Sequence, residues 1–455
     1  MSDSPPELAS PPIAPAQHRR GERFSVVAGA MVHGAVCLGR LDDGTALLVD
    51  GALPGELVDV ELHHRKGRLW FARTVAVGEA SPYRVGAPCP YYGECGGCQL
   101  QHVDYAHQLT LKQDVVRDAM RRQHVALPHD ITVHGMDDPW RYRWRGEFHV
   151  IPGDTGMADA RLGFNRMRSW KPVPVDDCLI HHPRIADALP ALRSLVRGAG
   201  TTDLTALHLT VGEDGNELLL RPRPTRAIPS AAVDAQARTA EVRWSTNSTT
   251  LHWRGHDFRV LPDTFIQVNW GQLETLYGSA LRGLGDVAGT TIVDAYAGIG
   301  VLACELATAG ASVVCIENNR DSARFGVLNS ELNGCAGRVR YIAAAVEDAL
   351  PSAGVGADAI VLDPPRAGCH PRVAAWLALA GPPTIVYLSC DPATMARDLR
   401  LLSVSGPYRI EDFELVDMFP QTHHIECVAT LHRGDLTPLE AIRSAPLPWG
   451  PPPDT

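Results

Sequence analysis

The C-terminal half of the chain alternates short apolar runs with segments that have helical periodicity. The runs that end at Asp294 and Glu317, and the runs 359–362 and 384–388, are apolar at nearly every position. Such runs, bounded by glycine, proline or acidic residues, are typical of strands that are buried on both faces of a parallel sheet. The pattern therefore predicts an open α/β sheet with helices between its strands.

Polar residues stand where these strands end. Asp294 and Glu317 close the first two strands, Asp363 follows the third and Cys390 follows the fourth. Open α/β folds place their ligands and their chemistry at this edge of the sheet. Residues 408–433 then predict a closing pair of antiparallel strands, with Glu426 directly after a His-His-Ile segment.

A glycine turn follows the first strand, in the sequence DAYAGIG. Gly298 and Gly300 let the backbone approach a ligand, and a carboxylate at the end of the next strand suits two ribose hydroxyls. With Ala303 as its third position the turn also satisfies the dinucleotide pattern, so an NAD-dependent oxidoreductase is one alternative. The loops 363–368 and 389–392 offer no His or Tyr as proton donor for a hydride transfer, which disfavours that alternative.

The N-terminal half has a different pattern. Residues 22–82 contain short alternating runs separated by Gly, Asp-Gly and Pro-Gly turns, which predict a small β-barrel. Residues 108–123 have the periodicity of an amphipathic helix, and residues 201–223 predict a hairpin with a glycine-containing turn.

Three stretches of this half combine basic and aromatic residues. His63, His64, Arg65, Lys66 and Arg68 stand beside Trp70 and Phe71. Residues 140–145 alternate aromatic and arginine residues, and residues 161–171 contain three arginines and a lysine without an acid. Basic groups that track phosphates, together with aromatics that stack on bases, are typical of single-stranded nucleic-acid binding. The alternative for the first stretch is a solvated hairpin with core aromatics, and for a strand over 140–145 a solvated arginine face.

Composition narrows the class of protein. The chain has 455 residues, 45% hydrophobic and 21% charged, with a net charge of −10. No apolar run approaches the ~18 residues of a membrane span, and the N-terminus has no apolar core of a secretory signal, so we expect a cytoplasmic protein. The net charge argues mildly against nucleic acid, unless the basic stretches form a local patch. The Pro-rich ends, residues 1–21 and 434–455, are expected to be disordered.

The eleven cysteines include a dense group. Cys89, Cys95 and Cys98 are separated by five and then two residues, and two glycines lie in the tighter part. Without a disulfide context, such spacing favours a metal site. Zinc and an iron–sulfur cluster both need a fourth ligand, for which Cys178 is the first candidate and His181 or His182 are weaker ones. These residues alone do not distinguish zinc from iron–sulfur.

The motifs together resemble one enzyme family. The cysteine group, PDTFIQVN, DAYAGIG, IEN, LDPPRAG, LSCDP and HHIECVATL are similar in order and spacing to the RNA (uracil-5)-methyltransferases, and residues 22–82 resemble a TRAM domain, an OB-like RNA-binding barrel. The resemblance covers about residues 22–433. It implies three domains: a TRAM barrel at 22–82, a central α+β iron–sulfur domain at 83–260, and a class I S-adenosylmethionine methyltransferase domain with a Rossmann-like sheet at 261–433.

The same resemblance implies the site residues and the partners. Gln267, Tyr296, Glu317 and Asp363 would contact S-adenosylmethionine, Cys390 would be the nucleophile, Glu426 the base, and Cys89, Cys95, Cys98 and Cys178 the ligands of a [4Fe–4S] cluster. The implied reaction converts a uridine of ribosomal or transfer RNA to 5-methyluridine, and we expect a monomer. Val301 and Ala344 replace polar residues found in some members, which makes side-chain contacts to the cofactor there doubtful. A non-catalytic RNA-binding protein with a relict cofactor fold is the other alternative.

Overall fold

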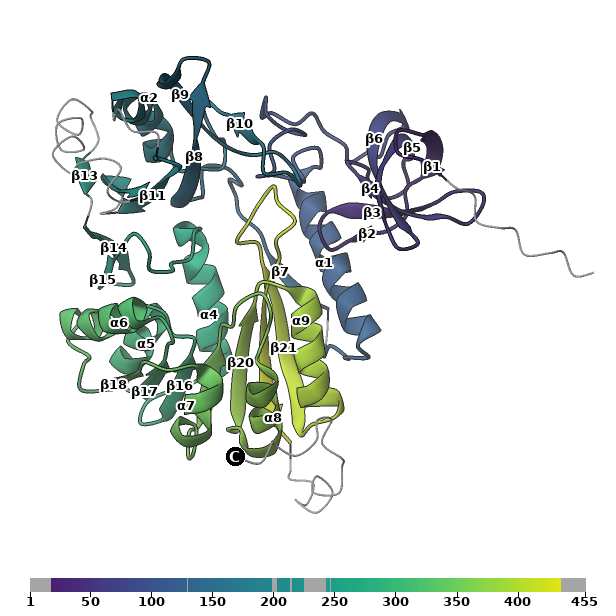
Figure 1. Ribbon diagram of the computed structural model, residues 1–455. Helices are drawn as coiled ribbons and strands as arrows, with labels where there is room; N and C mark the ends of the chain where they lie inside the picture. Colours follow the sequence, from purple (N-terminus) through teal and green to yellow (C-terminus); the bar gives the residue numbers. More distant parts are fainter. Residues whose placement is uncertain are drawn as a thin grey trace, which may run out of the picture. The chain divides into compact units, whose positions relative to one another are not determined.

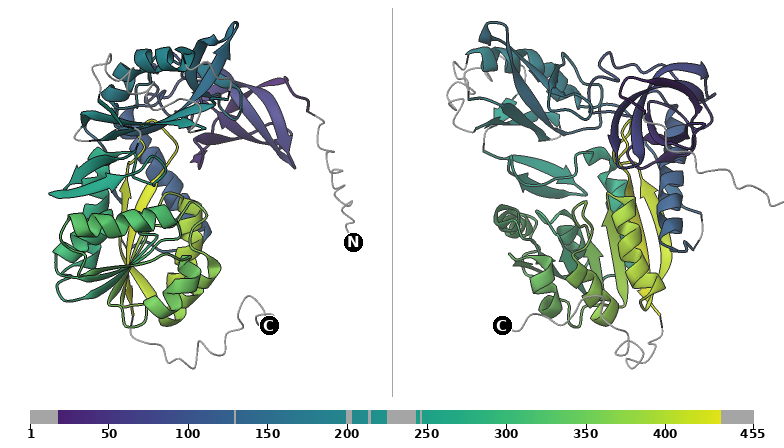
Figure 2. Two further views of the ribbon diagram at one scale, coloured as in Figure 1. Left: turned by 60° about the vertical axis from the view of Figure 1, so that its left-hand side comes forward. Right: turned by 45° about the vertical axis from the view of Figure 1, so that its right-hand side comes forward.

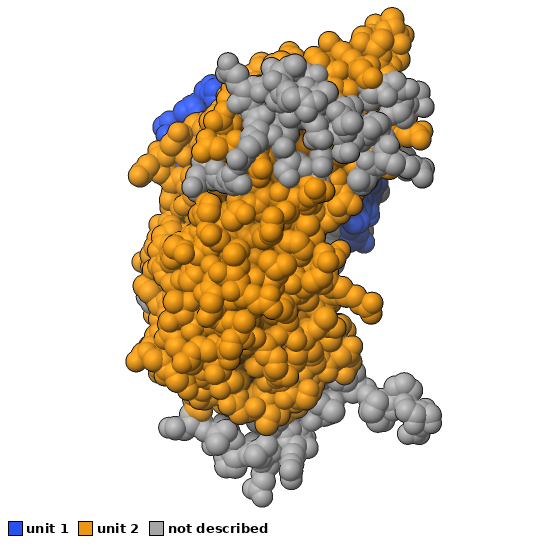
Figure 3. Space-filling view, turned by 90° about the vertical axis from the view of Figure 1, so that its left-hand side faces the viewer, with its two compact units in different colours: residues 1–88, 99–111 blue, residues 89–98, 112–455 orange. Residues whose placement is uncertain are grey.

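The computed structural model describes residues 18–128, 130–198, 203–212, 215–224, 243–245 and 247–434 (Figure 1). The expectations for residues 1–17 and 435–455 lie outside these ranges. The chain forms two compact units, drawn in different colours in Figure 3: residues 1–88 with 99–111, and residues 89–98 with 112–455.

The first unit contains a six-stranded sheet in the order β1-β5-β6-β4-β3-β2. Its strands are β1 (Arg23–Val27), β2 (Met31–Val32), β3 (Val36–Arg40), β4 (Ala46–Asp50), β5 (Leu57–Lys66) and β6 (Leu69–Glu79). The backbone N–H of Gly29 donates to Leu38 O at 2.7 Å and the N–H of Leu38 to Ala30 O at 3.0 Å, so the chain after β1 also pairs with β3. This second pairing closes the sheet into a barrel, as the alternating runs predicted.

In the hairpin between β5 and β6, the basic residues are exposed and the tryptophan is buried. Trp70 is only 6% exposed and packs in the barrel core, so this aromatic is structural. The basic residues from His64 to Arg68 are exposed, and the ring of His64 stacks on Phe71 with centroids 4.3 Å apart. The hairpin therefore presents charge to solvent while its tryptophan stabilises the barrel.

The second unit begins with a helix and a six-stranded sheet. Helix α1 (Tyr105–Arg122) confirms the predicted amphipathic helix, although its residues up to 111 belong to the first unit. The sheet has the order β10-β9-β8-β11-β12-β13. Its elements are β8 (Arg145–Gly153), β9 (Gly156–Asn165), β10 (Pro172–Pro174), β11 (Ala206–Gly212), β12 (Glu217–Arg223) and β13 (Arg243–Ser245), and α2 (Pro183–Gly198) packs against it. The predicted hairpin is β11–β12.

Residues 140–145 do not form the single strand that would put their arginines on one face, so that interpretation of their alternation is wrong. Strand β8 begins only at Arg145, and Arg141 has a left-handed backbone with φ of 52°. The guanidinium of Arg141 binds the Asp177 carboxylate, and that of Arg143 donates to Arg145 O at 3.0 Å. These arginines therefore bind protein groups and do not form an alternating basic face.

An eight-stranded sheet forms the rest of the second unit, in the order β18-β17-β16-β19-β20-β22-β21-β7. The strands β16 to β20 are parallel and β22 is antiparallel to both of its neighbours, which confirms the α/β sheet and its closing antiparallel pair. The strands are β7 (Thr132–His134), β16 (Thr291–Ala295), β17 (Ser312–Ile316), β18 (Val339–Ile342), β19 (Ala359–Leu362), β20 (Thr384–Ser389), β21 (Tyr408–Val416) and β22 (Glu426–Arg433).

Helices cover both faces of this sheet (Figure 2). One core packs α1, α7 (Val346–Ala353), α8 (Pro371–Ala380) and α9 (Pro392–Leu399) on one face. The other core packs α4 (Leu273–Leu284), α5 (Val301–Thr308), α6 (Arg320–Leu332) and the hairpin of β14 (Thr249–Trp253) and β15 (His256–Val260) on the opposite face. Successive strand residues alternate between the cores: Ile385 and Tyr387 face the first, Val386 and Leu388 the second. This explains why the central strands are apolar at every position.

Candidate active site

The carboxyl ends of the parallel strands bring four predicted residues to one edge of the sheet. Asp294 is the second-last residue of β16, Glu317 directly follows β17, Asp363 follows β19 and Cys390 follows β20. Because these strands are parallel and adjacent in the order β17-β16-β19-β20, their ends meet at the same edge. The structure thus places together residues that are up to 96 positions apart in the chain.

The glycine turn after β16 is hydrogen-bonded to the carboxylate of Glu317. The carboxylate of Glu317 accepts hydrogen bonds from the backbone N–H of Gly298 at 2.9 Å and of Asn319 at 2.7 Å. Gly298 and Gly300 have φ of 55° and 83°, and a Cβ on Gly300 would lie 2.4 Å from the Tyr341 hydroxyl. A carboxylate has about four acceptor positions, so Glu317 keeps capacity for a ligand's hydroxyls.

Tyr296 follows β16 in a left-handed conformation with φ of 68°. Its ring packs against the first core, and burial raises the pKa of its hydroxyl. The side chain is therefore held at the carboxyl end of β16, next to the glycine turn.

Buried carboxyls line the same edge. The Gln267 amide Nε2 donates to Asp363 Oδ2 at 3.4 Å, so the loop before α4 reaches the end of β19. Burial raises the pKa of Asp363 to about 7. Burial, and secondarily the charges of Asp363 and Glu317, raise the pKa of Asp294 to about 7 as well. Accumulated negative charge in a buried site favours a cationic ligand.

Cys390 and Glu426 come from neighbouring antiparallel strands. The register of β20 and β22 pairs Ser389 with Cys427, so the next position outward sets Cys390 opposite Glu426. Burial, and then the charges of Glu426 and Asp363, raise the pKa of the Cys390 thiol to about 11, whereas Arg366 acts to lower it. Burial and Asp363 likewise raise the pKa of Glu426 well above its usual value.

Arg366 contributes a positive charge at the carboxyl edge of the sheet. Its guanidinium lies 3.0 Å from Nδ1 of His424, which stands two residues before Glu426. Burial, and then the charges of His423 and Arg366, lower the pKa of His424 to about 2, so the imidazole is neutral and accepts the hydrogen bond. The loop that contains Arg366 thus contacts the segment that leads into the carboxylate.

Two supporting groups were missed by sequence reasoning. The buried carboxyl of Asp398 in α9 accepts hydrogen bonds from the Cys369 backbone N–H at 2.9 Å and from the Tyr387 hydroxyl at 2.7 Å, and so fixes the loop after β19. Lys112 in α1 donates to Asp417 at 2.6 Å, before the segment that leads to Glu426. Both are charged residues on an otherwise apolar helix face, which is the signal that could have revealed them.

Arg145 has a role that its sequence context did not suggest. Its buried guanidinium donates to the backbone carbonyls of Leu261 and Thr264, in the loop that leads to Gln267. Burial lowers the pKa of Arg145 to about 10. The backbone N–H of Trp144 also donates to Val268 O at 2.7 Å. The start of β8 therefore holds the Gln267 loop in place.

The four predicted cysteines also come together. Cys178 lies within electrostatic range of Cys89 and Cys95, and Tyr142 is beside both Cys98 and Cys178. Burial raises the pKa of Cys178 to about 11, and the Gly97 N–H donates to the sulfur of Cys95 at 3.5 Å. Within the described ranges, however, no group of three or more His, Cys, Asp or Glu side chains is arranged so that it could hold a metal ion.

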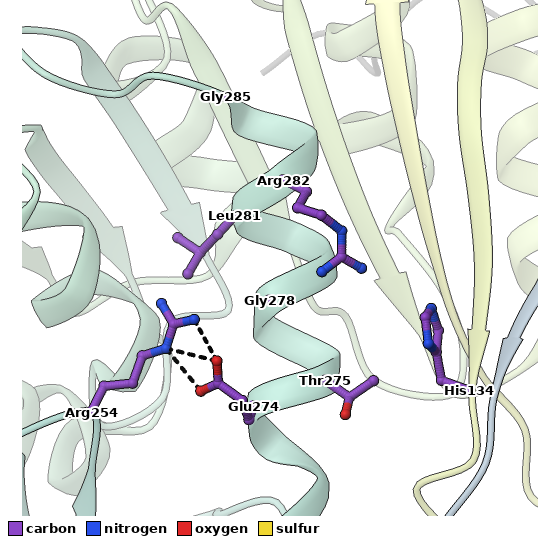
Figure 4. A pocket seen from close by; sticks show the side chains of 8 residues that line it. All are labelled: His134, Arg254, Glu274, Thr275, Gly278, Leu281, Arg282 and Gly285. Carbon is purple, nitrogen blue, oxygen red and sulfur yellow. Dashed lines mark hydrogen bonds and ion pairs between the residues drawn. The ribbon is translucent and has the colours of Figure 1, made fainter.

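A separate hollow of about 580 Å³ lies along α4 (Figure 4). Its guanidinium groups are already paired, Arg254 with Glu274 at 2.8 Å and Arg282 with Glu414 at 2.9 Å. None of the candidate active-site residues Asp294, Glu317, Asp363, Cys390 and Glu426 lines it, so it is distinct from that site.

Known proteins are similar in sequence to this chain over most of its length. The family model of the tRNA (Uracil-5-)-methyltransferases matches residues 244–434. An uncharacterized RNA methyltransferase of Gloeobacter violaceus is 35% identical over 93% of this chain and 99% of its own length. A 23S rRNA (uracil(1939)-C(5))-methyltransferase of Aromatoleum aromaticum is 32% identical, covering 86% of this chain and 95% of its own. The chain belongs to the S-adenosylmethionine-dependent RNA (uracil-5-)-methyltransferase family.

The fold of this methyltransferase agrees with that membership. The structure of the Pyrococcus abyssi tRNA (uracil-54, C5)-methyltransferase, in complex with S-adenosyl-L-homocysteine, superimposes with a TM-score of 0.67. The match covers 90% of this chain and 100% of that chain at 23% identity, which shows a shared fold. Membership in the family excludes the NAD-dependent oxidoreductase. No helix among the described parts of the methyltransferase is long and apolar enough to cross a membrane.

Proposed function

We propose that this RNA (uracil-5-)-methyltransferase methylates carbon 5 of a uridine in 23S ribosomal RNA through a covalent bond between Cys390 and the uracil. The observation that carries the proposal is the placement of Cys390 opposite Glu426 at the carboxyl edge of the sheet. A ribosomal substrate is favoured because the relative named for 23S rRNA is 32% identical over 95% of its length, whereas the solved tRNA enzyme is 23% identical.

The chemistry explains why a thiol and a carboxylate are needed together. Carbon 5 of uracil is too weak a nucleophile to take a methyl group from a sulfonium. Addition of the Cys390 thiolate to carbon 6 turns the ring into an enolate, whose carbon 5 is nucleophilic. S-adenosylmethionine supplies the methyl group. The Glu426 carboxylate then removes the proton from carbon 5, and the Cys390 sulfur leaves carbon 6 with its electron pair.

Both groups must lose a proton before they can act. Burial raises the pKa of the Cys390 thiol to about 11 and that of the Glu426 carboxyl well above its usual value, so burial opposes both proton losses in the free protein. Arg366 is the nearby cation that opposes this effect for both groups, so it favours the reactive thiolate and carboxylate. We assign Arg366 this electrostatic role.

We assign the cofactor contacts to Gln267, Tyr296, Glu317 and Asp363. Glu317 suits the ribose hydroxyls, and Asp363 with Gln267 places an acceptor and an amide beside the buried carboxyl of Asp294. A sulfonium with an ammonium group would relieve the cost of ionising these carboxyls. Val301 begins α5 and Ala344 follows β18, and both offer only hydrocarbon to the cofactor.

We assign a [4Fe–4S] cluster to Cys89, Cys95, Cys98 and Cys178. A [4Fe–4S] cluster is normally held by four cysteine thiolates, and Cys178 lies within electrostatic range of Cys89 and Cys95. The Gly97 N–H donates to the Cys95 sulfur at 3.5 Å, a bond that would stabilise a thiolate ligand. His181 stacks on Phe164 with its ring 5.5 Å away, and its Nε2 faces Gly146, so cysteine is favoured as the fourth ligand.

We further propose the TRAM assignment for the barrel of residues 22–82, whose exposed basic hairpin would bind RNA phosphates. The central domain would then comprise residues 83–260 and the methyltransferase domain residues 261–433. Each assignment is supported by the order of the motifs along the chain.

The deciding experiment uses anaerobically purified protein and S-adenosylmethionine labelled in its methyl group. The RNA comes from a strain that lacks the gene, with 23S rRNA and tRNA assayed separately. We expect label in 5-methyluridine of the 23S rRNA only, and none with Cys390→Ala, although that variant still binds the cofactor. Label in another nucleoside would contradict the roles of Cys390 and Glu426, and label in tRNA alone would contradict the ribosomal substrate.

A further inference from the structure

Trp170 lies in the turn 166–171, between β9 and β10, and is 92% exposed. Proteins usually bury most of a tryptophan side chain, because its large apolar surface is costly to leave in water. It is the most exposed of the large hydrophobic side chains in the described part of the chain. An indole held this far into solvent is suited to contact a partner.

The turn that holds Trp170 is ordered by its own hydrogen bonds. The backbone N–H of Arg166 donates to Lys171 O at 2.8 Å, and that of Ser169 donates to Arg166 O at 3.1 Å. The backbone N–H of Lys171 donates to the Ser169 hydroxyl at 3.1 Å. Arg168 takes a left-handed conformation with φ of 52°, which turns the chain at this point. The tryptophan is therefore presented on a preorganised turn.

The turn is also fastened to the cysteine loop. The backbone N–H of Gly96 donates to Asn165 O at 2.9 Å, and that of Met167 donates to Glu94 O at 3.0 Å. Between them lies a hollow of about 520 Å³, lined by Gly96, Gly97, Phe164, Asn165, Arg166, Arg168, Ser169 and Trp170. A hollow of this size, with an aromatic wall, accommodates one planar base.

The charge around the hollow is positive. Residues 160–175 contain Arg161, Arg166, Arg168 and Lys171 and no acidic residue. Arg166 is paired with Glu94 at 2.6 Å, and Arg161, Arg168 and Lys171 are also exposed on this segment. Positive charge beside an exposed aromatic complements a single-stranded nucleic acid, whose bases stack and whose phosphates are anionic.

We propose that Trp170 stacks on an unpaired base of the substrate RNA at a second site, remote in sequence from Cys390, while Arg168 and Lys171 bind the flanking phosphates. The inference rests on the proposed function, since it takes the substrate to be RNA. It adds a docking site on the central sheet that orders a single-stranded segment beyond the uridine that is methylated.

The test compares Trp170→Ala with Trp170→Phe in the full-length, cluster-loaded protein. The probe is a fluorescently labelled, uridine-rich single-stranded RNA, and its Kd is measured by anisotropy. Loss of one stacked base weakens binding roughly 5- to 150-fold, and phenylalanine should retain most of the affinity. Leu332→Ala, an exposed apolar residue on α6, is the matched control and should bind like the parent protein.

Two further readouts separate stacking from other effects. Lys171→Ala should lower the salt dependence of log Kd by about 0.7, whereas Trp170→Ala should leave that slope unchanged. With 23S rRNA, Trp170→Ala should raise KM and leave kcat unaltered. Parental RNA affinity in Trp170→Ala, equal loss in Trp170→Phe, or dissociation of a dimer by Trp170→Ala would each overturn the proposal. Absence of 5-methyluridine with the parent protein would instead refute the proposed function, while the Kd comparison would still test the stacking.

Discussion

Cys390 and Glu426 stand opposite each other, one residue beyond Ser389 and Cys427, the last paired residues of β20 and β22. The thiol is at the end of a strand that leaves the sheet, and the carboxyl is at the start of the strand that enters it. Residues that face each other across an antiparallel pair have neighbouring side chains, even when they are far apart in the sequence.

Replacement of Glu426 by glutamine should separate the two halves of the reaction. Cys390 would still add to the uracil, but no base would remove the proton from carbon 5, so the protein–RNA adduct would accumulate. We expect turnover to fall about 10²- to 10⁴-fold. A band of protein bound to RNA on a denaturing gel would show the adduct. Glu426→Gln with Cys390→Ala should give no such band, and an adduct that turns over at the parental rate would contradict the role of Glu426.

Removal of Arg366 should make Cys390 less reactive. The guanidinium lowers the pKa of this thiol, which burial has raised to about 11, so Arg366→Ala should raise it further. Because Arg366 is exposed, its effect is modest, and we expect alkylation of Cys390 at a fixed pH below the pKa to slow by no more than about tenfold. Alkylation is measured by mass spectrometry of the Cys390 peptide. Arg366→Lys should largely preserve the rate, and equal rates in parent and Arg366→Ala would exclude this electrostatic role.

The arrangement of the sheet could be predicted because it depends on local signals. Runs that are apolar at every position specify strands buried on both faces, and the polar residue that ends each run falls at the shared edge. The same reasoning failed for residues 140–145, since alternation alone does not reveal that Arg141 bends the chain and pairs with Asp177.

Other features depend on contacts between distant residues. Strand β7 has only three residues, and it is ordered by pairing with β21 across more than 270 positions. Trp70 and Phe71 are neighbours in the sequence, yet only the closure of the barrel makes the first a core residue. The pattern of the chain predicts which residues reach the edge, while tertiary packing decides which charged groups support them.

Asp294 should make the stability of the cofactor-free protein depend on pH. Its pKa is about 7 in the folded protein and about 3.9 in the unfolded chain, so the folded state binds more protons between these values. Its contribution to the free energy of unfolding is therefore fully present below pH ~4 and is lost as the pH rises through about 7, by an amount on the order of a few kcal/mol.

Urea denaturation of Asp294→Asn over this pH range tests the prediction. Asparagine has the same shape and does not ionise, so the decline in stability from acid to neutral pH should become shallower. Glu331→Gln, an exposed substitution on α6, is the control and should follow the parent curve. Parallel curves for Asp294→Asn and the parent would show that Asp294 ionises in the folded protein as it does in the unfolded chain.

The buried ion pair of Lys112 and Asp417 should hold α1 against the segment that leads to Glu426. Nζ of Lys112 is 2.6 Å from Asp417 Oδ1 and 3.0 Å from Phe419 O, and the two side chains are 2% and 0% exposed. Lys112→Met leaves a buried carboxylate without its cation, so we expect a loss of about 3–5 kcal/mol in the free energy of unfolding.

A double-mutant cycle measures how much of that loss belongs to the pair. Because burying an ion pair is itself costly, Lys112→Met with Asp417→Leu should recover most of the stability that Lys112→Met loses. Arg117→Ala on the same helix, which breaks exposed pairs with Asp114 and Asp130, should cost less than about 1 kcal/mol. The double variant should still have a lower kcat than the parent, since the Phe419 carbonyl loses the Lys112 ammonium and keeps only the Thr422 hydroxyl and backbone N–H as donors. Parental kcat in the stable double variant would show that the pair stabilises the fold without positioning Glu426.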